Sequence, residues 1–149
     1  MADNYATLFQ MSKIERVLVV LSVAGILVSV YLTFKTYDPS SVACSIGGGC
    51  ETVLSSDYAK LLGIPVSIFG IFWYVAMLGL LYFSTIKKAA LRVQIEVWVV
   101  LGLLFSLPLL YLEAFVIHAY CTWCLVSLGI VSLMNILIFL PNKMKGLKK

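Results

Sequence analysis

Four cysteines form two closely spaced pairs, and they are the residues of this chain best suited to chemistry. Cys44 and Cys50 flank five residues that end in three glycines, whereas Cys121 and Cys124 flank only two. Either pair can close a disulfide, and a thiolate of one pair can attack the disulfide of the other. The spacing therefore indicates thiol–disulfide exchange between the two pairs.

The Cys-x-x-Cys pair is the sharper motif. Cysteines three residues apart on a helix share one face, so their sulfurs can bond with little rearrangement. At a helix N-terminus the unpaired amides and the helix dipole stabilise a thiolate. We expect Cys121 to be the point of attack and Cys124 to lie one turn deeper.

The glycines Gly47–Gly49 give the other pair a different character. Glycine reaches backbone conformations closed to other residues, so this loop can close a disulfide or swing away. Such mobility suits a shuttle between an aqueous partner and a buried site. We expect Cys44 to meet that partner and Cys50 to attack Cys121.

Two other uses of the cysteines stay open. The four can form two purely structural disulfides, or they can hold a tetrahedral zinc ion through four thiolates. A zinc site leaves the glycines and the apolar surroundings unexplained, so we expect no metal. The glycines are not a phosphate cradle, because no Lys-Ser/Thr follows them.

The chain around these pairs has the composition of a membrane protein. Hydrophobic residues make up 62% of the 149 residues and charged residues 12%, and the mean hydropathy is +1.03. The apolar residues fall in unbroken blocks, which predicts spans over about 17–35, 64–86, 97–117 and 119–140. We therefore predict one all-α integral membrane domain over 1–149, a four-transmembrane-helix bundle. The net charge of +4 comes from few residues at the ends of these blocks and does not indicate nucleic-acid binding.

Basic residues predict the orientation of the spans. Nine of the eleven lie before the first span, between the second and third, or after the fourth. By the positive-inside rule these segments and both termini are cytoplasmic. All four cysteines then lie at the extracytoplasmic face of a multi-pass cell-membrane protein, where disulfides persist. The first apolar run is too long for a signal peptide and lacks a clean cleavage site.

Polar and aromatic residues beside the spans extend this interpretation. Ser55 or Ser56 can cap a short helix that ends at Gly63 before Pro65 and lies over the bundle as a lid. The Ser56 hydroxyl also suits a hydrogen bond to a ligand oxygen or a thiolate. A second group has expected structural roles inside and around the bundle: a kink at Pro108, a helix-tying bond from Asn135, and interfacial belts from Trp73, Trp98, Trp123, Tyr111 and Tyr120.

Glu113 and His118 stand just before the Cys-x-x-Cys pair. Ionisable groups in a span are costly and often functional. Both residues are expected near the outer interface, however, where solvation suffices, and we favour that interpretation over a proton relay. Trp123, between the two cysteines, is expected to border a ligand pocket.

Taken together, these residues resemble the vitamin K epoxide reductase family in its prokaryotic form. The resemblance rests on both cysteine pairs, on Ser56, and on the segments Gly63-Ile64-Pro65, Ser67-Ile68-Phe69-Gly70 and Cys121-Thr122-Trp123-Cys124. It implies a four-helix bundle around a quinone, capped by the segment outside the membrane. It also implies that Cys44 exchanges with a thioredoxin-like protein, Cys50 with Cys121, and that Cys124 and Ser56 lie close to the quinone.

Two departures from the animal members bear on the substrate. Those members have an Asn where this chain has Val66, and a Tyr where it has Leu128. The loss of both hydrogen-bonding groups argues against epoxide reduction and for a plain quinone acceptor. Some bacterial members carry a fused thioredoxin-like domain, and this chain is expected to use a separate partner.

The sequence thus predicts a thiol–disulfide oxidoreductase. We expect it to oxidise a secreted thioredoxin-like partner and pass two electrons to a membrane quinone, namely ubiquinone, menaquinone or a relative, with vitamin K also open. The expected quinone contacts are Ser56, Val66, Phe69, Trp123, Cys124 and Leu128. The alternatives are a vitamin K (epoxide or quinone) reductase of the animal type, and a non-catalytic four-helix membrane protein with structural disulfides.

Overall fold

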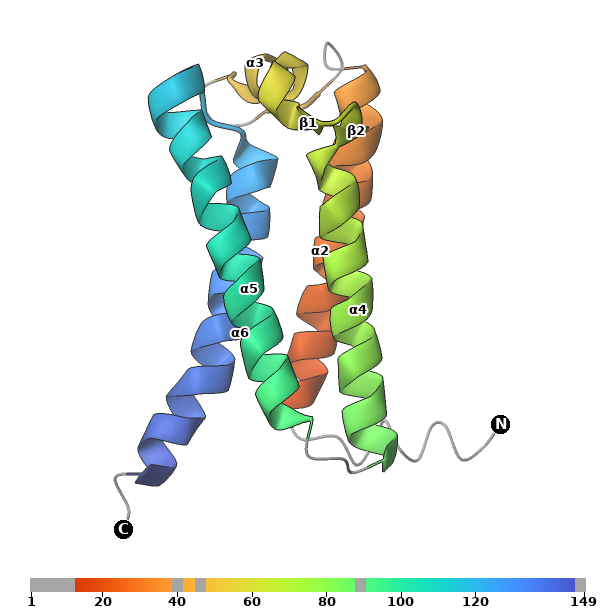
Figure 1. Ribbon diagram of the computed structural model, residues 1–149, viewed down its shortest axis with the longest axis vertical. Coiled ribbons are helices and arrows are strands. Elements are labelled where there is room, and N and C mark those ends of the chain that lie inside the picture. The colour runs from red at the N-terminus through yellow and green to blue at the C-terminus, as the bar shows by residue number, and fades with distance from the viewer. Residues whose placement is uncertain (1–12, 39–41, 45–47, 88–90, 147–149) are drawn as a thin grey trace.

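Four long helices run side by side in the computed structural model, which describes residues 13–38, 42–44, 48–87 and 91–146 (Figure 1). They are α2 (Lys13–Tyr37), α4 (Val66–Lys87), α5 (Arg92–Tyr111) and α6 (Thr122–Gly146), and η3 (Leu112–Ile117) extends α5. In the described part of the chain, four helices are long and apolar enough to cross a membrane. The predicted all-α membrane bundle is confirmed.

The helix bounds differ from the predicted spans chiefly where polar residues continue a helix beyond its apolar run. The first helix begins at Lys13 and the third at Arg92, outside the apolar runs, because Lys, Arg and Glu are good helix formers. The fourth begins at Thr122 and not at 119, since the backbone at 118–121 is not helical. Cys121 therefore precedes the last helix directly.

Successive long helices run in opposite directions (Figure 1). As a result, the start of α2 and the end of α6 lie at the end of the bundle opposite the short helix α3 (Cys50–Ser55). Helix α2 packs along both α4 and α6, and α5 packs along α6. These contacts join all four long helices into one bundle.

Small and large side chains alternate in the packed interior. Gly25 of α2 is buried under Tyr74 of α4, whose ring stands where a Cβ at Gly25 would lie. Small residues let transmembrane helices approach closely. Asn135 donates from Nδ2 to the carbonyl of Val99 at 3.0 Å, which joins α6 to α5 and confirms its predicted helix-tying role.

Trp73 and Trp98 form a cross-brace between α4 and α5. Trp73 Nε1 donates to the carbonyl of Trp98 at 3.2 Å, and Trp98 Nε1 donates to the carbonyl of Trp73 at 3.1 Å. Their rings are stacked, with 7° between the planes. Each indole N–H is therefore satisfied by the facing helix, and the predicted place of these residues in interfacial belts stays a prediction.

A small cap covers the end of the bundle. It consists of α3, the short η2 (Asp57–Ala59) and a hairpin of β1 (Lys60–Leu61) and β2 (Ile64–Pro65). The hairpin turns at Leu62 and Gly63, which have φ of 55° and 83°. Positive φ at both central residues is the geometry of a tight two-residue hairpin turn.

The cap corrects the predicted lid helix. The α-helix of the cap precedes Ser56, and only the three-residue η2 follows it, with no cap bond from the Ser56 side chain; Gly63 turns a hairpin instead of ending a helix. Ser55 Oγ and Ser56 Oγ donate to carbonyls of α3, at 2.7 Å to Glu51 and 2.7 Å to Val53. The serines therefore satisfy carbonyls at the C-terminal end of one helix, a competing use of short hydroxyl side chains.

Candidate active site

Both cysteine pairs lie at the capped end of the bundle. Cys44 and Cys50 form a disulfide with their Cα atoms 5.9 Å apart, while Cys121 and Cys124 are free thiols. Cys50 and Cys121 are fully buried in one apolar cluster, against which Cys44 and Cys124 pack. The folded chain thus brings together thiols that are far apart in sequence.

Three contacts hold the segments of Cys44 and Cys50 against residues 120–123, around the start of α6. Cys44 Sγ lies 3.5 Å from Thr122 Oγ1, and Trp123 Nε1 donates to the carbonyl of Ala43 at 2.8 Å. The backbone of Gly49 packs directly against the backbone of Tyr120, where a Cβ would come within 2.8 Å of its N and O atoms. The residues preceding Cys50 and Cys121 are therefore in contact.

The two free thiols lie at the start of α6, Cys121 directly before the helix and Cys124 in its first turn. The backbone N–H of Cys124 donates to Cys121 Sγ at 3.4 Å. A hydrogen bond from the Cys124 thiol lowers the pKa of Cys121, and amide donors at the helix start act in the same direction. Burial and the charge of Glu113 oppose this shift in the pKa without cancelling it. Cys121 is consequently the easier of these sulfurs to present as a thiolate.

Glu113 lies within the site and not in solvent. The third span passes from α5, which contains Pro108, into the π-helical turns of η3, and the Ala119 N–H bonds to the Glu113 carbonyl at 3.1 Å. The Glu113 side chain is 5% exposed, and its Oε2 accepts from the Cys121 N–H at 3.1 Å. The expectation of a solvated Glu113 is wrong, whereas His118 is exposed as expected.

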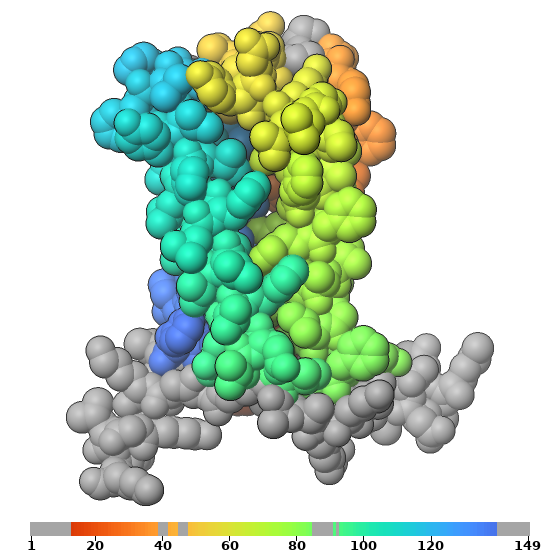
Figure 2. Space-filling view, viewed as in Figure 1, coloured from red at the N-terminus to blue at the C-terminus, as the bar shows by residue number. Residues whose placement is uncertain are grey.

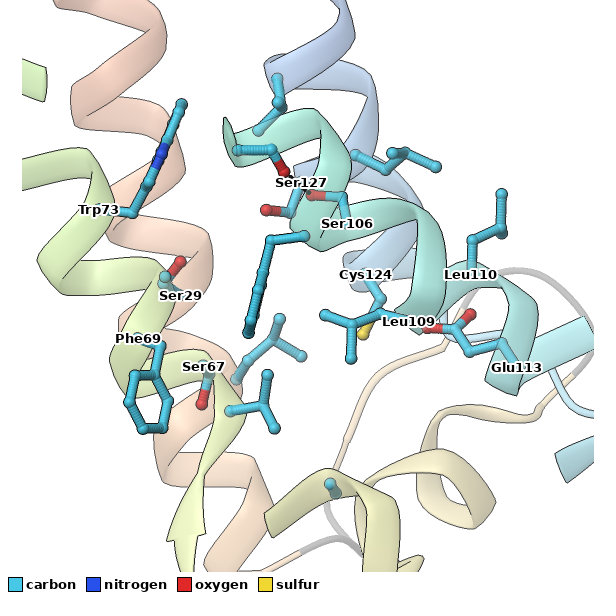
Figure 3. A pocket seen from close by; sticks show the side chains of 18 of the residues that line it. Ser29, Ser67, Phe69, Trp73, Ser106, Leu109, Leu110, Glu113, Cys124 and Ser127 are labelled. Atoms are coloured by element: carbon cyan, nitrogen blue, oxygen red, sulfur yellow. Dashed lines mark hydrogen bonds between the residues drawn. The ribbon is translucent and has the colours of Figure 1, made fainter. Parts of the chain in front are cut away.

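A cavity of about 640 Å³ opens below the cap, among α2, α4, α5 and α6. Figure 2 shows the molecular surface hollowed between α4 and α5, and Figure 3 shows Cys124 and Glu113 on one wall of the cavity with Ser29, Ser67 and Phe69 on the facing wall. The volume falls in the range of small-molecule sites, and the lining is mostly apolar with a few polar groups. These properties fit a flat, neutral, lipophilic ligand.

Five of the expected ligand contacts line this cavity: Ser56, Val66, Phe69, Cys124 and Leu128. Trp123 is not among the described residues that line this cavity, so the cavity does not support its predicted contact with the ligand. Its ring packs against Tyr31, 4.9 Å between centroids, while its N–H holds Ala43. The Trp123 side chain therefore points toward Ala43 and Tyr31 instead of the bundle interior.

The spacing of residues in the sequence does not predict that several polar residues line the cavity. They are the polar residues Ser29, Ser67, Tyr74, Ser106 and Ser127, which the sequence presents as isolated polar positions in apolar helices. A small hydroxyl within a span can mark either helix packing or a cavity. Only the arrangement of the helices distinguishes these uses.

Comparison with known proteins assigns the chain to a family. The model of the vitamin K epoxide reductase family matches residues 16–139, which include all four cysteines. The chain belongs to this family. The vitamin K epoxide reductase domain of this chain is also similar to a plant protein, "Thiol-disulfide oxidoreductase LTO1" of Arabidopsis thaliana, with 44% identity over 45 residues. That match covers 30% of this chain and only 12% of the plant protein, far less than its full length.

Family membership and the four membrane-length helices agree with the predicted multi-pass membrane domain. The resemblance inferred from the cysteine pairs, Ser56 and the Gly63–Gly70 region is thereby confirmed. In the described residues no cluster of His, Cys, Asp and Glu suits a metal ion.

Proposed function

We propose that this protein oxidises the dithiol of a thioredoxin-like partner and passes the two electrons to a membrane quinone, supporting disulfide-bond formation. The observation that carries the proposal is the placement of the two cysteine pairs one behind the other in space, from the cap toward the cavity. The cap pair, Cys44 with Cys50 of α3, lies at the cap. The inner pair, Cys121 with Cys124, lies between the cap and the apolar cavity. The plant relative, which is named as a thiol-disulfide oxidoreductase, supports the same class of reaction.

The exchange steps follow from these positions. A partner thiolate attacks Cys44, which frees Cys50 and forms a mixed disulfide. The partner's second thiolate then attacks the partner sulfur of this bond and releases Cys44, so that the partner is oxidised and the cap pair is reduced. When Cys121 and Cys124 are joined in a disulfide, the Cys50 thiolate attacks Cys121, breaks that disulfide and frees Cys124 in the cavity wall. Cys44 attacks Cys50 in turn and releases Cys121, whose lowered pKa makes it a good leaving group.

This sequence ends with a disulfide in the cap and a dithiol at the start of α6, the pattern that the structure has. A quinone held in the cavity would accept two electrons and two protons as the Cys121–Cys124 disulfide forms. Ser56, Val66, Phe69 and Leu128 would hold its ring, and Cys124 would face it. The apolar side chains at Val66 and Leu128 favour a plain quinone over an epoxide, because they offer no hydrogen bond to an epoxide oxygen.

The placement of the capped end also forms part of the proposal. The excess of basic residues in the sequence before the first span, between the second and third, and after the fourth favours cytoplasmic termini and an extracytoplasmic cap. A membrane-impermeant thiol reagent added to intact, reduced cells should therefore label Cys44. Labelling only after the cells are opened would contradict this orientation.

The reaction itself is tested by mixing purified protein, a reduced thioredoxin-like protein and a short-chain quinone, and following quinone absorbance. Wild type should reduce the quinone, and Cys124→Ala should not. No reduction by wild type, or full activity of Cys124→Ala, would refute the proposal. Release of quinone from vitamin K epoxide would instead support the animal-type activity.

A further inference from the structure

Glu113 is a buried carboxyl for which the exchange of disulfides provides no use. It lies in the third membrane-crossing segment and is 5% exposed. An ionisable side chain in such a position is costly, and those that persist commonly mark a path for protons, ions or substrates. The surroundings of Glu113 therefore bear on the terminal step of the reaction.

The carboxyl of Glu113 lies beside both members of the dithiol. Its Oε2 accepts the Cys121 backbone N–H at 3.1 Å, and the carboxyl lies close enough to the Cys124 thiol to interact with it electrostatically. Glu113 and Cys124 line the same cavity, and Figure 3 shows them close together on one wall of it. A group in this position reaches the sulfur and the cavity at once.

Few other groups of the described cavity wall can accept a proton. Apart from Glu113 and Cys124, its titratable residues are Tyr58 and Tyr74, and a tyrosine is already protonated near neutral pH. The Tyr74 hydroxyl is paired with Ser127 Oγ at 3.0 Å. Among the lining residues that the structure describes, Glu113 is the one carboxyl.

We propose that Glu113 is a catalytic proton carrier, which takes the proton of the Cys124 thiol and delivers it to a quinone oxygen in the cavity. This inference rests on the proposed function. As the Cys121–Cys124 bond forms, the two sulfurs lose two electrons and the quinone gains them. Glu113 supplies one of the two protons of the quinol and returns to a carboxylate. The second proton of the quinol comes from water. It balances the proton that Cys121 released to water when its thiol ionised.

The substitution Glu113→Gln separates this role from a structural one. Glutamine keeps an oxygen that can accept the Cys121 N–H, so the turn before the helix is preserved, but it cannot carry a proton. In a single turnover of prereduced, full-length protein with a short-chain ubiquinone, we expect Glu113→Gln to slow quinone reduction about 100-fold, with partner exchange at Cys44–Cys50 changed by less than about twofold. Glu113→Asp, which keeps a carboxyl on a shorter stem, should recover part of the rate.

A spectroscopic measurement without quinone tests the contact directly. In the reduced protein, at a pH where Cys121 is itself protonated and no Cys121 thiolate holds the Cys124 proton, a hydrogen bond to the Glu113 carboxylate should shift the S–H stretching band of Cys124 to lower frequency. The band is assigned by its loss in Cys124→Ala, and it should move to higher frequency in Glu113→Gln. A carboxyl that serves only to hold the Cys121 amide would leave the band unmoved, and that result would overturn the proposal.

The outcomes separate the two hypotheses. A wild-type protein that reduces no quinone contradicts the proposed function itself. A wild type that reduces quinone, with Glu113→Gln equally fast, overturns the role of Glu113 alone. If Glu113→Gln fails to fold, Glu113→Asp and the S–H band of the wild-type protein decide: a Cys124 band at the frequency of a thiol without a hydrogen bond refutes the inference.

Discussion

The backbone of Gly49 lies directly against the backbone of Tyr120. A Cβ at Gly49 would stand 2.8 Å from both the N and the O atom of Tyr120 and 3.1 Å from Ala119 Cβ. Each of the two backbones leads into a cysteine that is fully buried, Cys50 on one side and Cys121 on the other. This close approach therefore sets how near the cap pair can come to the pair on α6.

Gly49→Ala should slow electron transfer between the two cysteine pairs. The added methyl group meets backbone atoms that cannot rotate away, so the start of α3 must shift, and overpacking of this kind costs about 1–3 kcal/mol. If the state in which the two cysteine pairs are aligned is destabilised by this amount, electron transfer between the pairs should be about tenfold slower or more. The rate is measured by reducing the cap pair, quenching with acid at set times, and trapping free thiols with a mass-shifting maleimide.

Gly129→Ala is the matched control for this substitution. Gly129 lies on α6, and a Cβ added there would have no neighbouring atom within 4 Å, so its methyl group displaces nothing. The substitution should leave the transfer rate unchanged. Equal rates for Gly49→Ala and wild type would show that the contact with Tyr120 does not position the cysteines.

Trp123→Phe should loosen the cap without disturbing the cavity. The change removes the hydrogen bond from Trp123 Nε1 to the Ala43 carbonyl, worth about 1 kcal/mol, and keeps an aromatic ring beside Tyr31. Transfer between the pairs should slow about fivefold, while the prereduced inner pair reduces quinone at the wild-type rate. Tyr120→Phe is the control. A selective loss of quinone affinity in Trp123→Phe would instead support the predicted contact of Trp123 with the quinone.

The parts of the fold that local sequence determines were predictable. Unbroken apolar runs predicted four spans, and the cysteine spacings predicted two pairs that the four-helix topology brings to one end of the bundle. The helix-tying bond of Asn135 followed from the cost of leaving an amide unpaired in an apolar bundle. In each case the sequence itself shows the physical cause: the length of an apolar run, the spacing of two cysteines, or a polar side chain that must find a partner.

The parts that depend on contacts between segments were not predictable. Whether Trp123 faces the cavity or the cap is decided by the start of α6 at Thr122 and by the acceptor at Ala43, eighty residues earlier. The burial of Glu113 depends on the π-helical turns of η3, which no pattern of apolar residues marks. Ser56 lines the cavity as expected, yet its hydroxyl is bonded to a carbonyl of α3.

The thiolate of Cys121 should form at lower pH when Cys124 is present. The hydrogen bond from the Cys124 thiol is the main cause of the lowered pKa, so Cys124→Ala should move the ionisation of Cys121 to higher pH. The titration is followed by the ultraviolet absorbance of the thiolate in protein whose cap disulfide is intact, with Cys121→Ser as the blank. Cys124→Ser keeps a hydroxyl donor and should shift the midpoint less. An unchanged midpoint in Cys124→Ala would exclude this hydrogen bond as the cause.

Leu128→Trp should narrow the cavity and weaken quinone binding. Leu128 lies one helical turn below Cys124 and lines the cavity, so an indole there occupies space that the ligand ring would need. We expect KM for a short-chain ubiquinone to rise about tenfold or more, whereas partner exchange at the cap pair stays at the wild-type rate.

Leu133→Trp provides the control, because Leu133 is 42% exposed on the same helix and does not line the cavity. It tests whether a bulky aromatic residue on α6 impairs the protein by its size alone. A wild-type KM in both variants would mean that the quinone reaches Cys124 by a route outside this cavity. Equal defects in both would point to a general loss of packing instead of a blocked site.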